Sequence, residues 1–174
     1  MAGTLSVQKI QGLATSATPT TVEISSGHKL TGAAGSIVAT DSIIQVQSVN
    51  PAVANFHLTS TSFVTTGIAI SITPKFSTSK ILISASFNAY KGTTNKVNLT
   101  IYKDSTNLGH STYGMQEFSE LGGAGGVPVN LQIVNSPSTT SQVTYTVYAK
   151  VNNNDAYIQS NSVVGNITAM EIAQ

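Results

Sequence analysis

The chain has 174 residues, of which 9% are charged, and eight lysines against seven acidic residues give a formal net charge of +1. A net charge this small leaves no excess of positive charge for neutralising phosphates, and the sequence has no arginine for bidentate readout of bases. We therefore do not expect nucleic acid as a partner. Cysteine is absent, which excludes disulfides and thiolate metal sites, and without a secretory signal or an apolar run near the roughly 20 residues of a membrane span we expect a soluble product.

The first 41 residues differ from the rest because their apolar residues come in short pairs separated by Gly, Ser, Thr and Pro. Ordering each residue costs roughly 1 to 2 kcal/mol, and such a segment has too few apolar residues to recover this cost by folding on itself. We therefore predict an extended N-terminal arm over residues 1–41 that orders against a neighbour. The residues expected to make its assembly contacts are Leu5, Val7, Ile10, Val22, Ile24 and Leu30.

From residue 42 onward, alternation of apolar and polar residues predicts strands separated by turns. The predicted strands are 68–73, 80–90, 96–103, 127–134, 142–151, 156–160 and 166–173. The stretch 109–118 is less regular, and the glycine-rich run 121–126 is expected to form a flexible loop. In the strand 96–103, Val97, Leu99 and Ile101 are expected inside, and Asn98, Thr100 and Tyr102 outside.

About eight strands after residue 41, with no convincing helical period, predict an all-β fold. The architecture expected for residues 42–174 is an antiparallel β-sandwich similar to a jelly roll. Several strands are apolar on both faces. Ile43 lies beside Ile44, Leu82 between Ile81 and Ile83, and Val163 beside Val164, while Met170 and Ile172 lie opposite Ile167 and Ala169. Since a sandwich needs one apolar face per strand, we expect the second set to be buried between subunits of a homo-oligomer.

Residues with reactive side chains are few and scattered. The histidines His28, His57 and His110 lack carboxylates at ligand spacing, so solvated or interface positions are favoured over a metal site, although a symmetric oligomer could bring three copies of one histidine together. Glu117 and Glu120 form the one close acid pair, and a solvated loop is favoured over an acid/base pair. We expect no catalytic residue, no metal site, no cofactor and no enzymatic activity.

Six tyrosines, Tyr90, Tyr102, Tyr113, Tyr145, Tyr148 and Tyr157, suit either packing or a surface on which sugars stack. Packing in the core and at interfaces is favoured, because tryptophan is absent. The run 152–155 is rich in side-chain oxygens but lacks the charge of a calcium loop, and a hairpin turn explains it.

Four segments in order resemble the β-sandwich domain of virion structural and tail-fibre-like proteins of marine bacteriophages, especially those of cyanobacteria. They are Thr73-Pro74 with residues 79–82, residues 102–105 with 108–109, residues 136–145, and residues 167–172. The resemblance covers roughly residues 60–174, and residues 4–10 and 26–30 are similar to short β repeats that begin such proteins. It implies a virion part without enzymatic activity, commonly trimeric, and it transfers no catalytic residue.

The leading hypothesis is a capsid decoration or cement protein, a homotrimer on the capsid surface whose arm contacts neighbouring subunits or the major capsid protein. No long shaft precedes the sandwich, which favours this over a whole fibre. The alternative is a tail-fibre or receptor-binding tip that recognises a host surface glycan through loops carrying Tyr113, Glu117, Asn153 and Asp155. A cupin-like enzyme is the third hypothesis, and it would require several histidines and a carboxylate converging on a metal.

Overall fold

The computed structural model describes residues 26–27, 29, 31–32, 38–53, 55–91, 96–119, 125–159 and 164–174, and every regular element among them is a β-strand. The strands are β1 (Ile43–Val49), β2 (Phe56–Leu58), β3 (Val64–Ile72), β4 (Lys80–Lys91), β5 (Val97–Lys103), β6 (Thr106–Asn107), β7 (Gln116–Phe118), β8 (Gly125–Asn135), β9 (Val143–Val151), β10 (Ala156–Ile158) and β11 (Asn166–Ile172).

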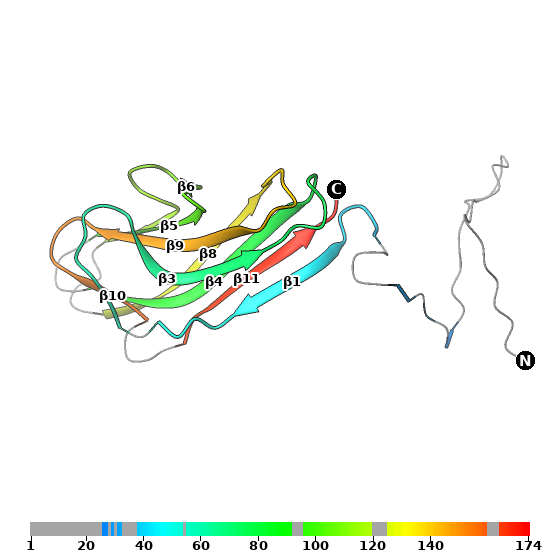
Figure 1. Ribbon diagram of the computed structural model, residues 1–174. Coiled ribbons are helices and arrows are strands. Elements are labelled where there is room, and N and C mark those ends of the chain that lie inside the picture. The colour runs from blue at the N-terminus through cyan, green and yellow to red at the C-terminus, as the bar shows by residue number, and fades with distance from the viewer. Residues whose placement is uncertain are drawn as a thin grey trace, which may run out of the picture.

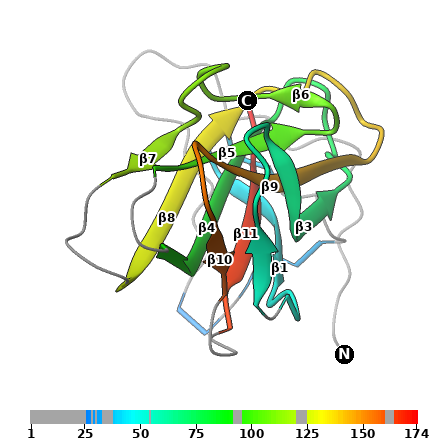
Figure 2. The ribbon, with the colours of Figure 1, turned by 90° about the vertical axis from the view of Figure 1, so that its left-hand side faces the viewer.

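The strands form two antiparallel sheets packed face to face (Figure 1; Figure 2). In the first sheet β4 is central, with β8 on one side and β11 followed by β1 on the other, while the short β10 and β2 continue the sheet beside the end of β4. In the second sheet the order is β3, β9 and β5, and the short strands β6 and β7 pair with the remaining side of β5.

The connectivity of the long strands is that of a jelly roll. Along the chain, β1, β4, β8 and β11 belong to the first sheet, and β3, β5, β7 and β9 to the second, so that the chain crosses between sheets at almost every step. The orders β1-β11-β4-β8 and β3-β9-β5-β7 match an eight-stranded double Greek key. The predicted all-β jelly-roll-like sandwich is confirmed.

The core lies between the sheets and is built from the alternate residues that the sequence predicts to point inward. Ile81, Ile83 and Ala85 of β4 are fully buried, as are Tyr145 and Val147 of β9 on the facing sheet. The strict alternation of buried and partly exposed residues along β9 shows that one face of the strand meets the core and the other meets solvent.

The glycine-rich run was predicted to be a loop, and this is wrong at its C-terminal end. β8 begins at Gly125, and Gly126 pairs with Tyr90 of β4. The reason is that β4 extends to Lys91 and offers backbone hydrogen-bonding groups to whatever lies beside it, whereas local propensity alone disfavours glycine in a strand.

β3 begins at Val64, four residues before its predicted start, because a bulge interrupts the alternation that the prediction relied on. The register against β9 shifts between Thr65 and Ala69, and Gly67 has a φ of 82°, a left-handed conformation that favours glycine. The Thr66 hydroxyl, buried at the bulge, donates to the Val147 carbonyl at 2.9 Å.

Asn98 and Thr100 were predicted to face outward, but they are buried, with 1% and 0% of their surface exposed. The segment 104–118 folds back along β5 and covers them, and it contains β7, which the sequence did not indicate. Met115 N–H donates to the Leu99 carbonyl at 2.7 Å, and the Thr100 hydroxyl donates to Asn107 Oδ1 at 2.6 Å. Segment 104–118 therefore buries polar side chains of β5, and these are hydrogen-bonded to the segment that covers them.

Candidate interaction surface

A row of four apolar side chains crosses the outer face of the first sheet. Val46 of β1 pairs with Met170 of β11, Met170 pairs with Leu82 of β4, and Leu82 pairs with Val134 of β8. We call these four residues the apolar row. Val46 and Val134, at the two ends, are 53% and 52% exposed, and Met170 and Leu82 are half-buried. Each of the four long strands of the sheet contributes one member, so the row exists only through the register.

A second apolar pair lies next to the apolar row, where Ile43 pairs with Ile172. Ile43 is 55% exposed. In a folded monomer these side chains gain little from facing water, and clustered exposed apolar residues mark interaction sites more often than isolated ones do.

Beyond the apolar residues this outer face is polar, and its charge next to the apolar row is Lys80 of β4, which is exposed and pairs with Ile172. The next row along the sheet consists of Ser48, Thr168, Ser84 and Gln132. Ser48 and Thr168 share a hydrogen bond between their hydroxyls at 2.9 Å, and the Asn166 amide donates to the Ser48 hydroxyl at 2.9 Å. Because no charge would have to be desolvated over these rows, the face suits contact with another neutral surface, including a copy of itself.

Four residues of this surface were foreseen and two were missed. The foreseen ones were predicted to be buried between subunits because their strands are apolar on both faces, and the structure brings them together: Ile43, Leu82, Met170 and Ile172. Val46 and Val134 complete the row but carry no signal of their own, because a lone valine on an exposed strand is ordinary. Val164, also suspected, is 68% exposed but lies outside the apolar row, and Val163 lies outside the described residues.

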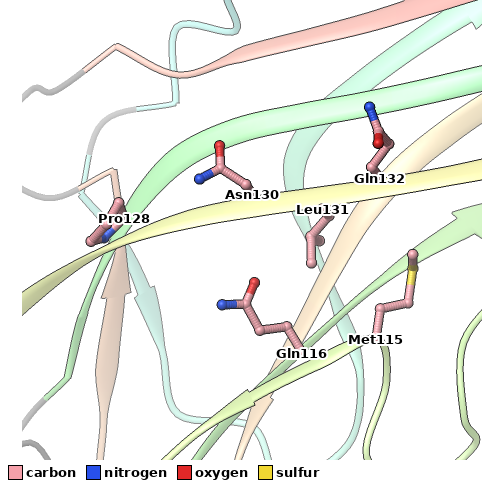
Figure 3. A pocket seen from close by; sticks show the side chains of 6 residues that line it. All are labelled: Met115, Gln116, Pro128, Asn130, Leu131 and Gln132. Carbon is pink, nitrogen blue, oxygen red and sulfur yellow. The ribbon is translucent and has the colours of Figure 1, made fainter.

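A groove of about 400 Å³ lies between β7 and β8, where the two sheets part at one edge of the sandwich (Figure 3). Leu131 of β8 and the Gln116 side chain of β7 point toward each other across it, and Met115 lies beside them, while Asn130 and Gln132 lie on the other side of β8. The side-chain oxygen of Gln116 is buried and accepts no hydrogen bond from the described residues. Sequence reasoning gave no indication of this groove.

The residues predicted as arm contacts, Leu5, Val7, Ile10, Val22, Ile24 and Leu30, lie outside the described residues. The point at which the chain joins the sandwich is described. Asp41 N–H donates to the Ala173 carbonyl at 2.8 Å, and Ala173 N–H donates to the Ser42 carbonyl at 3.0 Å. The chain therefore enters the fold beside the end of β11, on the β1 edge of the first sheet.

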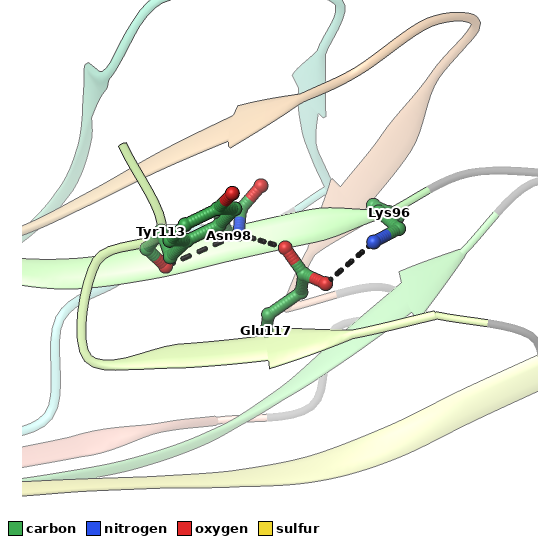
Figure 4. Close-up of polar contacts among 4 residues, drawn as sticks. All are labelled: Lys96, Asn98, Tyr113 and Glu117. Carbon is green, nitrogen blue, oxygen red and sulfur yellow. Dashed lines mark hydrogen bonds and ion pairs between the residues drawn. The ribbon is translucent and has the colours of Figure 1, made fainter. Parts of the chain in front are cut away.

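Two of the predicted loop residues, Tyr113 and Glu117, meet around Asn98 (Figure 4). The Asn98 amide donates to the Tyr113 carbonyl at 3.1 Å and to Glu117 Oε2 at 2.8 Å, and Lys96 Nζ donates to Glu117 Oε1 at 2.8 Å. The hydrogen bond from Lys96, followed by that from Asn98, lowers the pKa of Glu117 below its ordinary value. The Tyr113 side chain is 58% exposed and its ring stacks on that of His110.

The other two predicted loop residues lie in the turn after β9. Asn153 is exposed, and Asp155 Oδ2 lies 3.0 Å from His57 Nε2. Asn152 N–H donates to the Lys96 carbonyl at 3.2 Å, which places this turn beside the strand start that Glu117 also contacts. The structure thus brings the two predicted loops to the same end of β5.

The aromatic residues divide between packing and surface. His57, Tyr157 and Tyr90 are register neighbours, with His57 stacked on Tyr157 at 4.8 Å and Tyr90 edge-on to it at 6.3 Å. Tyr102 and Tyr148 stack at 3.9 Å on the outer face of the second sheet. Since stacked rings cover each other's faces, these pairs offer less surface for sugar stacking than six separate tyrosines would.

Side chains that could bind a metal ion do not gather at one place among the described residues. No group of three or more His, Cys, Asp or Glu side chains that could hold a metal ion occurs in the described part of the chain, and none of its segments forms a helix able to cross a membrane. His28 and Glu120 lie outside the described residues. The buried carboxylate of Glu171, which the sequence did not single out, accepts hydrogen bonds from the backbone N–H groups of Lys75 and Phe76.

Comparison with known proteins assigns this chain to no family. No protein-family model matches the chain, and no curated protein matches it. Among solved structures, one match is a chain described as "Crystal structure of the T13 IBDV viral particle reveals a missing link in icosahedral viruses evolution". It is 14% identical with a TM-score of 0.32, and the match covers 83% of this chain and 43% of that chain.

Proposed function

We propose that this protein is a non-enzymatic structural component of a bacteriophage particle, a capsid decoration or cement protein that assembles with copies of itself and with the shell. The observation that carries the proposal is the apolar row, which crosses all four long strands of the first sheet and ends in two half-exposed valines. The phage context comes from the resemblance of the strand and turn segments to marine phage virion proteins.

In this proposal the stabilisation comes from burying apolar side chains between subunits. Fully burying a Val, Leu, Ile or Met side chain stabilises by roughly 1.5 to 3 kcal/mol, and about half of that remains available for side chains that are already half-buried. The apolar row with Ile43 and Ile172 therefore offers several kcal/mol of gross stabilisation on contact. The uncharged row of Ser48, Thr168, Ser84 and Gln132 adds no desolvation penalty for ions, and Lys80 lies at the margin of the contact, in register with Ile172.

In this proposal three copies form a homotrimer through the outer face of the first sheet. The N-terminal arm then contacts neighbouring subunits and the major capsid protein. Repeated over a shell, such contacts reinforce the particle against internal pressure. No cofactor, metal or nucleic acid takes part, and the protein resides on the virion surface.

Charge introduced into the apolar row tests the proposal. Leu82→Lys and Val46→Lys place an ammonium in the contact, and we expect each to convert the oligomer to a monomer and to abolish binding to capsids. Ser71→Lys is the matched control, because Ser71 is exposed on the outer face of the second sheet. Mass measured by light scattering after gel filtration reports assembly, and circular dichroism checks the fold. An unchanged mass for both row variants would reject the proposal.

A specific observation favours the second candidate, a tail-fibre or receptor-binding tip. Tyr113 is 58% exposed beside the hydrogen-bonded group of Asn98, Glu117 and Lys96, and the turn with Asn153 and Asp155 lies at the same end of β5. An exposed ring beside polar side chains suits a sugar. Copy number separates the candidates: hundreds of copies per particle indicate the shell, and a few tens or fewer indicate the tail. Glycan binding that Tyr113→Ala abolishes would favour the tip.

A further inference from the structure

β8 is a long edge strand with one partner. It pairs with β4 along its whole length, and its other side meets no strand among the described residues. β7, the edge strand of the facing sheet, spans three residues, so it leaves this side of β8 open. Natural edge strands are usually short or protected by charges or proline. β8 is 11 residues long and carries no charged residue, and its one proline, Pro128, lies near the start of the strand.

Pro128 identifies which backbone groups face the open side. Antiparallel partners alternate between pairs that exchange two hydrogen bonds and pairs whose N–H and C=O groups point away from each other. Proline has no N–H, so the Asn88–Pro128 pair is of the second kind. The register is continuous, so Asn130 and Gln132 belong to the same kind. Their N–H and C=O groups therefore point to the open edge.

The groove beside this edge contains apolar side chains and one buried acceptor atom that an added strand could contact. Its apolar members Leu131 and Met115 flank the buried Gln116 side-chain oxygen, which accepts no hydrogen bond from the described residues. An added strand would place alternate side chains over Leu131 and Met115 and the others beside Asn130 and Gln132. The matching sequence is apolar at every second position and uncharged in between.

We infer that the open edge of β8 accepts residues 4–8 of a second copy of this chain as an added β-strand. This inference rests on the proposed role in assembly and names the acceptor of the arm. Residues 4–8 read Thr-Leu-Ser-Val-Gln, with Leu5 and Val7 at alternate positions and no charge between them. Leu5 and Val7 enter the groove, and Thr4, Ser6 and Gln8 lie beside the amides of β8.

The topology favours a second copy as the source of the strand. The N-terminal segment joins the first sheet at the β1 edge, and β8 forms the opposite edge of the same sheet. When copies are arranged with the β1 edge of one toward the β8 edge of the next, each arm meets its neighbour's acceptor. Such head-to-tail contacts form a ring when the rotation from one copy to the next closes. Residues 8 to 41 span up to about 110 Å when extended, so reach is not limiting.

The size of the sheet face also calls for a second contact. Four strands at about 4.8 Å spacing and seven residues at about 3.3 Å cover on the order of 400 Å². A stable interface buries about 800 Å² per partner. The apolar row with its flanking rows therefore supplies roughly half of what a stable oligomer needs, and an exchanged strand supplies more.

Proline substitution at the open edge tests the acceptor. Asn130→Pro removes an N–H that points away from β4, so it blocks strand addition while the β4–β8 pairing remains. Asn130→Ala is the matched control, since it removes the same side chain and keeps the N–H. We expect Asn130→Pro to lower the association constant at least tenfold and Asn130→Ala to leave it within twofold. Gln132→Pro repeats the test if Asn130→Pro fails to fold.

Disulfide trapping tests whether residues 4–8 occupy the open edge of β8. The chain has no native cysteine, so only the introduced cysteines can form a disulfide. One copy carries Asn130→Cys, and a second copy of different length carries a cysteine at position 5, 6, 7 or 8. Facing residues of paired strands have Cα atoms about 5.5 Å apart, which suits a disulfide. We expect mixed dimers with Ser6→Cys and Gln8→Cys, and at least fivefold less with Leu5→Cys and Val7→Cys, which face the groove.

The outcomes separate this inference from the proposed function. An oligomer that forms, depends on Leu82, and yet ignores Asn130→Pro and gives no alternating cross-links would reject strand addition and leave the apolar-row contact standing. Cross-links within one chain would also overturn the inference, because they show the arm on its own β8. A chain that remains monomeric at all concentrations would reject both.

Discussion

The carboxylate of Glu171 accepts a hydrogen bond from the backbone N–H of Lys75 at 2.7 Å, joining the last strand to the turn between β3 and β4. Phe76 N–H lies 3.3 Å from the same oxygen, and the Gln45 amide donates to the other oxygen at 3.1 Å. Glu171 is fully buried, directly between the outward-facing Met170 and Ile172. This carboxylate therefore holds β1, β11 and the β3–β4 turn together beneath the apolar row.

Truncating Glu171 should destabilise the fold. Glu171→Ala leaves the Lys75 N–H without its acceptor and removes one of the two acceptors of the Gln45 amide, the other being the Thr73 carbonyl. An unsatisfied buried group costs about 1 to 3 kcal/mol. Glu171→Gln keeps one acceptor and should lose less. Urea unfolding followed by circular dichroism measures both variants, with Gln47→Ala, at an exposed position of β1, as the control. Equal stability of Glu171→Ala and the wild type would contradict this role.

Removing the hydroxyl of Tyr145 should cost about 0.5 to 1.5 kcal/mol, because one hydrogen bond is lost. The hydroxyl donates to Asn135 Oδ1 at 2.8 Å, and burial, with a smaller contribution from Asp104, raises the pKa of Tyr145 above its ordinary value. Tyr145→Phe therefore lowers the free energy of unfolding in a urea titration, while Tyr113→Phe, on an exposed ring, leaves it unchanged. A reversed order of the two variants would refute the assignment.

Acid should weaken the contact between β5 and β7. The lowered pKa of Glu117 means that its charged form is favoured in the folded state, so its contribution is complete above the ordinary pKa and is lost as the pH falls through the folded value. The carboxyl resonance of Glu117 in an NMR titration should have a midpoint below that of an unfolded peptide. Lys96→Met should move this midpoint upward, and a midpoint that does not move would argue against the ion pair.

Gly114 should not tolerate a side chain. Its φ is 72°, and a Cβ atom there would collide with the Leu99 carbonyl. Gly114→Ala should cost more than about 1 kcal/mol and speed amide exchange at Asn98 and Thr100, which the segment 104–118 covers. At Gly126 a Cβ would meet nothing within 4 Å, so Gly126→Ala serves as the control. Exchange rates measured by NMR distinguish local opening from global loss of stability.

Much of the fold follows from local alternation. In β4 and β9 the residues predicted to point inward are the buried ones, because the two-residue period of a strand depends only on its own backbone. In β5 the predicted inward residues are buried as well, together with Asn98 and Thr100. Period and turn spacing were enough to predict an all-β sandwich of jelly-roll type. The arm contacts predicted at Leu5 to Leu30 remain predictions, since those residues lie outside the described part of the chain.

The surfaces on which function is proposed depended on tertiary structure. The sequence by itself determined that Leu82 and Met170 are extra apolar residues, but register between distant strands placed Val46 and Val134 beside them. The fold-back of segment 104–118 decided that Asn98 is buried, and the short β7 decided that β8 has an open edge. Alternation is encoded residue by residue, whereas register and coverage are set by bulges, turns and partners far away in the chain.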